Sequence, residues 1–320
     1  MVGRVLSGID PLVRLLVVAI VLASVAPVTG EGRVIARSVS DGAIFLLFLL
    51  NGLRLPRHEV RAGIGNWRFL LPLGLWCFVA MGAAGWLLWQ AGMAMLPAQV
   101  ALGLLFLGVL PSTVQSATAY SSLGGGNVAT SVVAAAVINI AGVFVSAPLL
   151  ALLANTAAAE VDLAGLERIA LILILPFAIG QLAQGWAGGW VKGHRQLVTW
   201  FDRGSIAIAV YVAFSGAVEQ GLWGLVTPLQ WGALLVLVTL FLLLGFGGAW
   251  LLGGTLGLAR PERISFLFAG AQKSIALGAP LASVLFPPAV AGLLLLPVLV
   301  YHLLQLVISA PLANRLNQPR

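Results

Sequence analysis

The feature that most constrains this chain is a series of long apolar segments separated by short polar loops. A membrane-spanning helix needs about 20 mostly apolar residues, and the sequence offers ten such segments. They cover residues 11–29, 36–53, 67–90, 97–123, 126–153, 167–187, 203–220, 228–256, 264–286 and 288–314. Because 60% of the residues are hydrophobic and only 8% are charged, we expect an all-α polytopic protein with ten transmembrane helices in a lipid bilayer.

The basic residues indicate how these helices are oriented. With the N-terminus inside, all of the lysines and arginines except Arg33, Arg37, Arg168 and Lys273 fall on the cytoplasmic side. The positive-inside rule therefore predicts a multi-pass protein of the plasma (inner) membrane with cytoplasmic N- and C-termini. The net charge of +7 follows from this bias, so it does not indicate a nucleic-acid partner. Pro27 disfavours cleavage after the first segment, which we interpret as a retained helix.

Ten segments divide into two halves of five. An odd number per half makes the second half enter the membrane from the opposite side, so any repeat must be inverted. We expect a first five-helix repeat over residues 1–155, a second over 166–320, and an outer connecting loop at 156–165.

The fourth and ninth segments are interrupted in their middle. Pro111 breaks the fourth, and residues 270–280 place glycines, a proline and Lys273 inside the ninth. A lysine at mid-membrane depth costs about 2.5 to 3.5 kcal/mol on insertion scales, so it normally faces a polar cavity or a partner. Two broken segments in corresponding positions of two halves are typical of secondary transporters.

At these residues the sequence resembles the bile acid:sodium symporter (SBF) family, and within it the SBF-like branch. The stretches that carry the resemblance are 110–116, 126–129, 270–274 and 296–305. The resemblance implies two inverted five-helix repeats, a panel domain and a core domain, with the broken fourth and ninth helices crossing in the core. It also implies transport by movement of one domain against the other.

The resemblance directs attention to polar residues at and near the breaks. The candidate substrate- or ion-binding residues are Ser112, Thr113, Gln115, Ser116, Thr118, Asn127, Ser131, Gln272, Lys273, Ser274, His302 and Gln305. His302 and Gln305 lie one turn apart and face one side of the tenth helix. They are interpreted either as site residues or as ordinary contacts between helices.

The residues that bind sodium in sodium-coupled members are only partly present. The ninth-helix glutamate of those members is Phe268 here, and two further ligand positions are Ala117 and Ala135. Sodium prefers oxygen ligands, so we assign no metal site and leave Na⁺ or H⁺ as alternative coupling ions.

Lys273 suggests how the missing cation is replaced. Its ammonium could lie where sodium would bind and donate to Ser112, Thr113, Gln115, Ser116 or unwound backbone carbonyls. Burial disfavours the charged form of an amine, so a proton could be exchanged during transport. The alternative is a structural lysine that holds two helix ends together.

We therefore expect a secondary transporter of an organic, anionic solute that works by alternating access. The alternative is a non-transporting membrane regulator of cation homeostasis that retains the transporter fold. An enzyme is not expected, because the three histidines are far apart in the sequence and the spans contain no paired carboxylates. No cofactor is expected.

Overall fold

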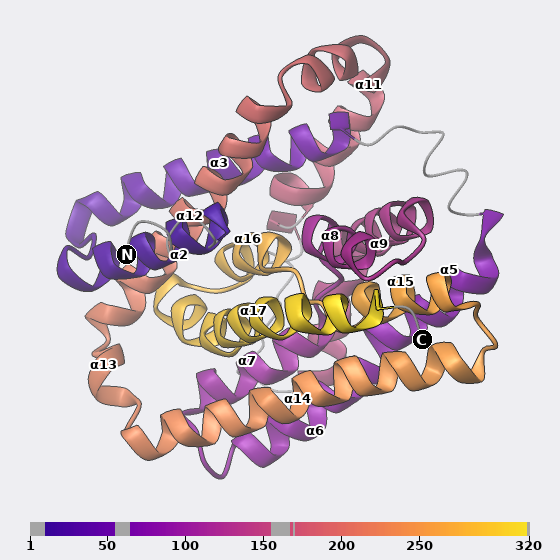
Figure 1. Ribbon diagram of the computed structural model, residues 1–320. Coiled ribbons are helices and arrows are strands. Elements are labelled where there is room, and N and C mark those ends of the chain that lie inside the picture. Colours follow the sequence, from indigo (N-terminus) through magenta and orange to yellow (C-terminus); the bar gives the residue numbers. More distant parts are fainter. Residues whose placement is uncertain (1–9, 55–64, 155–166, 169, 319–320) are drawn as a thin grey trace, which may run out of the picture. The chain divides into compact units, whose positions relative to one another are not determined.

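The computed structural model describes residues 10–54, 65–154, 167–168 and 170–318, and within them every regular element is a helix (Figure 1). The predicted outer connecting loop, 156–165, lies outside the described residues. The helices are α2 (Pro11–Val25), α3 (Gly30–Arg54), α5 (Trp67–Gly74), η1 (Leu75–Ala80), α6 (Met81–Gly92), α7 (Ala98–Val109), α8 (Val114–Leu123), α9 (Val128–Ala154), η3 (Ala170–Ile174), α11 (Leu175–Gly193), α12 (Arg195–Glu219), α13 (Leu222–Leu225), α14 (Pro228–Thr255), α15 (Arg260–Ala271), α16 (Ile275–Leu285) and α17 (Pro288–Leu316). The elements η1 and η3 are π-helical.

Among the described residues, eight helical stretches are long and apolar enough to cross a membrane, and the bent pair α7 and α8 makes a ninth. Each matches a predicted span. The first predicted span corresponds to α2, which has 15 helical residues and is therefore about 22 Å long. That is short for a hydrocarbon core of about 30 Å. The count of ten spans accordingly stays a prediction, whereas the all-helical membrane architecture is confirmed.

Several helices begin at signals that the sequence displays. Asp10 accepts a hydrogen bond from the Leu12 N–H and caps α2, whose first residue is proline. Thr227 and Gln230 form a capping box at the start of α14, which also begins with a proline. Such residues satisfy N–H groups that have no partner inside the helix. Proline is favoured there because its missing N–H is not needed.

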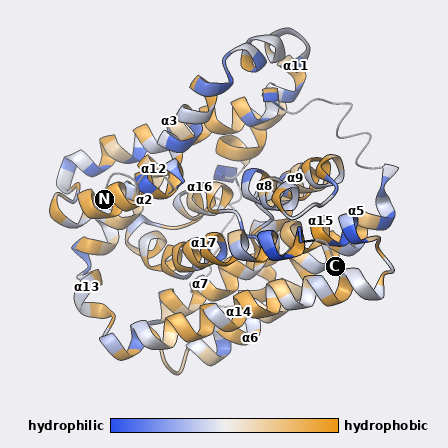
Figure 2. Cartoon of the chain, viewed as in Figure 1, coloured by the Kyte–Doolittle hydropathy of each residue, from blue (hydrophilic) through white to orange (hydrophobic). Residues whose placement is uncertain are grey.

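Many large apolar side chains of these helices are on the surface. Figure 2 shows hydrophobic residues along most of α14, and its exposed side chains include Leu240, Leu243 and Leu251. A surface this apolar suits contact with lipid chains and not with water. The protein is therefore embedded in a lipid bilayer.

The chain forms two compact units. Unit 1 comprises residues 1–56, 161–225 and 279–293, and unit 2 comprises residues 57–160, 226–278 and 294–320. Each unit takes segments from both halves of the sequence, and two of the boundaries between the units fall within α16 and α17. This grouping by contact differs from the predicted division into repeats at 155 and 166, which stays a prediction.

In unit 1, α3 packs closely along α11 (Figure 1). A Cβ atom on Gly52 would lie 2.3 Å from the Phe177 carbonyl oxygen, and one on Gly180 would lie 2.2 Å from that of Leu49. Small residues allow two membrane helices to approach this closely. The glycines therefore set the distance between α3 and α11.

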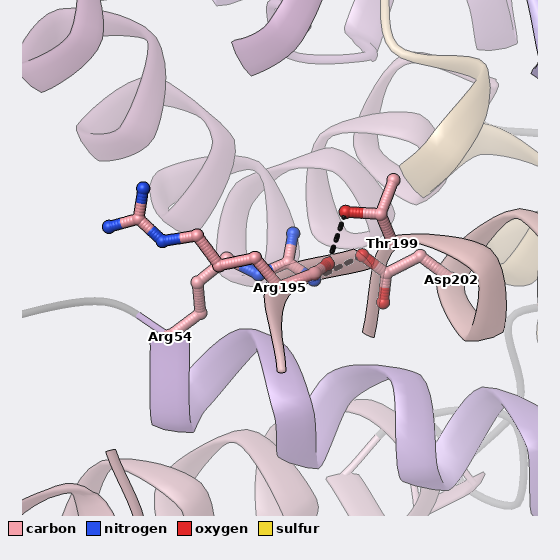
Figure 3. A network of polar contacts seen from close by, with 4 residues as sticks. All are labelled: Arg54, Arg195, Thr199 and Asp202. Carbon is pink, nitrogen blue, oxygen red and sulfur yellow. Dashed lines mark hydrogen bonds and ion pairs between the residues drawn. The ribbon is translucent and has the colours of Figure 1, made fainter. Parts of the chain in front are cut away.

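Ion pairs join α3 to α12 within the same unit. Arg33 pairs with Glu219, while Arg54 pairs with Asp202. Figure 3 shows Arg54 from α3 reaching Asp202, with Thr199 one turn earlier on α12. Because one pair joins the first turn of α3 to the last residue of α12, and the other joins the last residue of α3 to the third turn of α12, the two helices are antiparallel.

Unit 2 is built around α7 and α15. Every residue of α7 from Val100 to Val109 is buried, and so are the last eight residues of α15. Helices α6 and α7 meet at Gly85 and Gly108, where an added Cβ on Gly85 would lie 2.9 Å from the Gly108 Cα. The buried helices α7 and α15 therefore form the interior of unit 2, and each of them ends at one of the two breaks.

Candidate functional site

Both breaks lie in unit 2 and are joined by a backbone hydrogen bond. Residues 110–113 separate α7 from α8, and the two helices differ in direction by 60°. Residues 272–274 separate α15 from α16. The Ser274 N–H donates to the Pro111 carbonyl at 2.9 Å. Two segments about 160 residues apart in the sequence thus meet where each one leaves the helical conformation.

The Lys273 side chain is completely enclosed, with an exposed fraction of 1%. Its Nζ donates to the carbonyl oxygens of Cys77 at 3.0 Å, Gly108 at 2.8 Å and Leu110 at 2.7 Å. An ammonium has three N–H donors, so all of them are used. Of the acceptors predicted for Lys273, the unwound carbonyls are therefore the ones found, and the side chains of the fourth segment are not.

The three carbonyls are available because of where they stand in their helices. Gly108 and Leu110 lie at the C-terminal end of α7, where carbonyls lack partners inside the helix and the helix dipole is negative. Cys77 lies in the π-helical η1, in which the regular hydrogen-bond pattern is altered. Lys273 thus places its positive charge among carbonyls that come from a helix C-terminus and from a π-helical segment.

A second set of contacts surrounds the Gln272 side chain. Its Oε1 accepts from Ser116 Oγ and, at 3.5 Å, from Thr113 Oγ1. Its Nε2 donates to Ser309 Oγ at 3.1 Å. Gln272 therefore connects the start of α8 with α17.

The peptide group of Lys273 is held by Gln305 of α17. Gln305 Oε1 accepts from the Lys273 N–H at 2.8 Å, and Gln305 Nε2 donates to the Lys273 carbonyl at 3.1 Å. The same amide nitrogen lies 2.9 Å from Nδ1 of His302. The predicted pairing of His302 and Gln305 on one side of the tenth helix is confirmed.

Side chains also satisfy the last carbonyls of α15. Trp76 Nε1 donates to the Gly270 carbonyl at 3.2 Å, and the Tyr301 hydroxyl donates to that of Ala271. Neither residue was among the predicted site residues, and Ser309 of α17 was not among them either. Ser309 was recognisable, since it follows His302 and Gln305 at the spacing of one helical face. Trp76 and Tyr301 carry no such signal, because aromatic residues are common throughout these segments.

The remaining candidate residues are spread more widely. Ser274 accepts from the Leu277 N–H at 3.2 Å and so caps α16, and Ser112 is buried within the first break. Gln115 is exposed. The contacts of Asn127 lie away from the breaks. Its Oδ1 accepts from the Thr130 N–H, which caps α9, and its Nδ2 donates to Glu262. Those contacts give it a structural role.

Among the candidate site residues, two buried hydroxyls have no hydrogen-bond partner within the described part of the chain. They are Thr118 Oγ1 on α8 and Ser131 Oγ on α9. A buried hydroxyl normally finds a partner, and an unpaired one requires an explanation such as an ion or a water molecule. Both residues therefore remain candidates for contact with a transported species.

The three substituted positions, which the family resemblance aligns with sodium ligands, offer no side-chain oxygen. Phe268 is fully buried, and its ring centroid lies 6.0 Å from that of Tyr120 and 6.3 Å from that of Phe246. Ala117 and Ala135 are also fully buried. Across the described ranges, no group of three or more histidines, cysteines or acidic residues is arranged to hold a metal ion. Buried apolar side chains, Phe268 and Ala117, therefore stand where the resemblance places the acid and the amide of sodium-coupled members.

Comparisons with known proteins agree with this architecture. The chain is 37% identical over 307 residues to an uncharacterised Pseudomonas aeruginosa protein, PA2026, covering 95% of this chain and 92% of the relative. It is 35% identical over 311 residues to an Escherichia coli protein named "Putative symporter YfeH", covering 96% and 92%. Mouse sodium/bile acid cotransporter 7 is 23% identical over 287 residues, covering 86% and 82%.

The family assignment covers nearly the whole chain. The profile of the SBF-like CPA transporter family matches residues 10–318, which include both breaks and Lys273. The predicted resemblance to the bile acid:sodium symporter family and its SBF-like branch is confirmed, and with it a symporter-like membrane transporter. The chain belongs to the SBF-like CPA transporter family.

Proposed function

We propose that this protein is a secondary transporter of an organic anion in which Lys273 supplies, from within the chain, the positive charge that a bound sodium ion would supply. Transport then proceeds without sodium, by alternating access in the plasma (inner) membrane with both termini cytoplasmic. A proton is then the coupling ion. Sodium remains the alternative coupling ion.

The observation that carries this proposal is the set of three carbonyl oxygens around Lys273 Nζ, at 2.7 to 3.0 Å. Backbone carbonyls are also the groups that replace the hydration shell of a bound metal cation in ion-selective proteins. An ammonium that fills such a set of acceptors permanently leaves no need for a free cation there. The absence of a carboxylate at Phe268 is consistent with this.

The anionic character of the substrate is supported by the direction of two short helices. Helix α8 begins at Val114 and α16 begins at Ile275, each directly after a break. Helix N-termini carry partial positive charge and free N–H groups, which favour anions. Thr113 and Ser116 add hydroxyl groups at the same point. A carboxylate, sulfonate or phosphate group is the chemistry that such donors recognise.

The first test separates a sodium site from a fixed ammonium. Purified wild type and Lys273→Gln are melted in detergent with NaCl or with KCl at equal ionic strength, and across a range of pH. A ligand that binds only the folded state raises Tm by mass action. We expect equal Tm values in the two salts for the wild type, together with a fall in Tm at alkaline pH, where amines lose their proton, that Lys273→Gln removes.

The second test measures transport. Proteoliposomes with the wild type are assayed for uptake of candidate organic anions with sodium or potassium outside, and empty liposomes are the control. We expect uptake that is equal in the two salts. A sodium requirement in this reconstituted system would overturn the proposal.

The alternative function is a non-transporting membrane regulator of cation homeostasis. It is favoured by one observation, namely that all three donors of Lys273 are already bonded to the backbone, as a purely structural lysine would be. Substrate uptake by the purified protein excludes this alternative.

A further inference from the structure

The backbone of the second break fixes the orientation of one buried side-chain amide. Gln305 is fully buried and bonds to both the N–H and the carbonyl of Lys273. A backbone N–H can only donate and a backbone carbonyl can only accept. The oxygen of the Gln305 amide must therefore face the N–H of Lys273, and its NH₂ group must face the carbonyl.

This orientation in turn fixes the state of His302. The second hydrogen of the Gln305 NH₂ group points to Nδ1 of His302 at 2.9 Å. Since the amide nitrogen can only donate, Nδ1 must accept. His302 is therefore neutral, with its ring proton on Nε2.

A protonated His302 is incompatible with the same arrangement. Its Nδ1–H would face the NH₂ group of Gln305, donor against donor. Turning the amide by half a rotation would relieve that clash, but it would place NH₂ against the Lys273 N–H and oxygen against the Lys273 carbonyl. Both bonds that hold the Lys273 peptide would be lost.

We propose that His302 and Gln305 are positioning residues that hold the Lys273 segment only while His302 is neutral. Uptake of a proton by His302 releases that segment. The inference rests on the proposed function, in which Lys273 carries the fixed charge, and it deepens that function by naming the group at which a proton acts. The two residues act through Lys273 and are not ligands of the transported anion.

The titratable groups around this pair are already engaged in unit 2. Lys273 Nζ is bonded to three carbonyls, and the Tyr301 hydroxyl donates to the Ala271 carbonyl. Tyr120 on α8 donates to the Leu306 carbonyl at 3.3 Å, and Cys77 on η1 lies 3.7 Å from the Ala269 carbonyl. No acidic residue follows Glu262 in the sequence. Within this set, His302 is therefore the group whose protonation would break a hydrogen bond to Gln305.

The chain contains its own reporter for this release. Cys77 is the one cysteine in the sequence, its side chain is 1% exposed, and its carbonyl is one of the three that Lys273 holds. Loss of the Lys273 contacts would let a maleimide reach the thiol. The experiment measures the rate of Cys77 alkylation by N-ethylmaleimide in the purified protein from about pH 5 to about pH 8, the range in which histidines change charge.

The matched control is His302→Asn. The Asn oxygen can accept from Gln305 near the position of Nδ1, but it cannot take up a proton. Dividing the wild-type rate by the His302→Asn rate at each pH removes the pH dependence of the thiol itself. We expect a ratio near one at pH 8 that rises roughly tenfold towards pH 5, as the loss of one or two hydrogen bonds would produce. A Gln305→Leu variant should label quickly at every pH.

A ratio that stays near one throughout would overturn the proposal. The measurement needs neither substrate nor coupling ion, so that result would leave sodium-independent transport standing. Conversely, a sodium requirement for uptake would remove the proposed function without altering the labelling ratio. If Gln305→Leu fails to fold, the comparison of the wild type with His302→Asn still decides the question.

Discussion

Units 1 and 2 use polar side chains in opposite ways. All the ion pairs found in the described residues lie in unit 1, as between Arg33 and Glu219. Unit 2 instead has a lysine enclosed among backbone carbonyls, together with neutral hydrogen bonds around Gln272 and Gln305. The side chains in these pairs are 13 to 45% exposed, whereas a fully buried charge must have every donor satisfied. Ion pairs in unit 1 therefore hold helices α3 and α12 together, whereas unit 2 contains a polar interior.

This contrast predicts a large loss of stability when the buried lysine is removed. Lys273→Met keeps the volume but leaves three carbonyls without a donor, and an unsatisfied buried acceptor costs about 1 to 3 kcal/mol. We expect a loss of about 3 kcal/mol or more, measured as a lower Tm in detergent. Lys192→Met, at an exposed position of unit 1, is the control and should have little effect. Equal Tm values for the two variants would show that the carbonyl contacts contribute nothing to stability.

A smaller effect is expected where unit 1 depends on close packing. Gly180→Ala places a methyl group 2.2 Å from the Leu49 carbonyl oxygen, so α3 and α11 must move apart. Overpacking of this kind costs about 1 to 3 kcal/mol. The control is Gly185→Ala on the same helix, where an added Cβ meets nothing within 4 Å. If both variants melt at the wild-type temperature, the glycine contact does not set the helix spacing.

The smallest effect is expected from the ion pairs. Asp202→Asn removes the carboxylate from Arg54, whose side chain is 39% exposed, so solvent screening limits the loss to about 1 kcal/mol or less. Added salt should weaken this pair in the wild type and reduce the difference between wild type and variant. The effect of Lys273→Met should not depend on salt. A salt-independent effect of Asp202→Asn would contradict the comparison between the units.

Much of the architecture could be predicted, because a chain segment in lipid must satisfy its own backbone hydrogen bonds, and an apolar run of about 20 residues does so as a helix. The apolar runs, the interruptions at Pro111 and near Lys273, and the shared face of His302 and Gln305 were all readable from spacing. Asn127, predicted as a site residue, caps α9, and its place in a binding site stays a prediction. Its sequence position, directly after three glycines, is equally suited to a helix cap, and spacing alone could not separate the two roles.

The limits of prediction are clearest for Lys273. Its place inside an apolar segment required a partner, and the sequence offered several hydroxyl and amide groups near the other break. The structure instead supplies carbonyls from η1 and from the end of α7. Every residue has a carbonyl, so nothing in the sequence distinguishes the three that are used. Their availability depends on a π-helical turn and on a helix end.

The sequence by itself determined that this protein is helical, lies in a membrane, carries two broken segments and places one lysine within the second of them. The physical reason is that hydrophobic length and the cost of a buried charge are local properties of the chain. Only the tertiary structure decided which groups meet at the breaks, such as Ser274 with Pro111 and Gln305 with Lys273. Those pairs join residues 32 to 163 positions apart, and such contacts are set by the packing of whole helices.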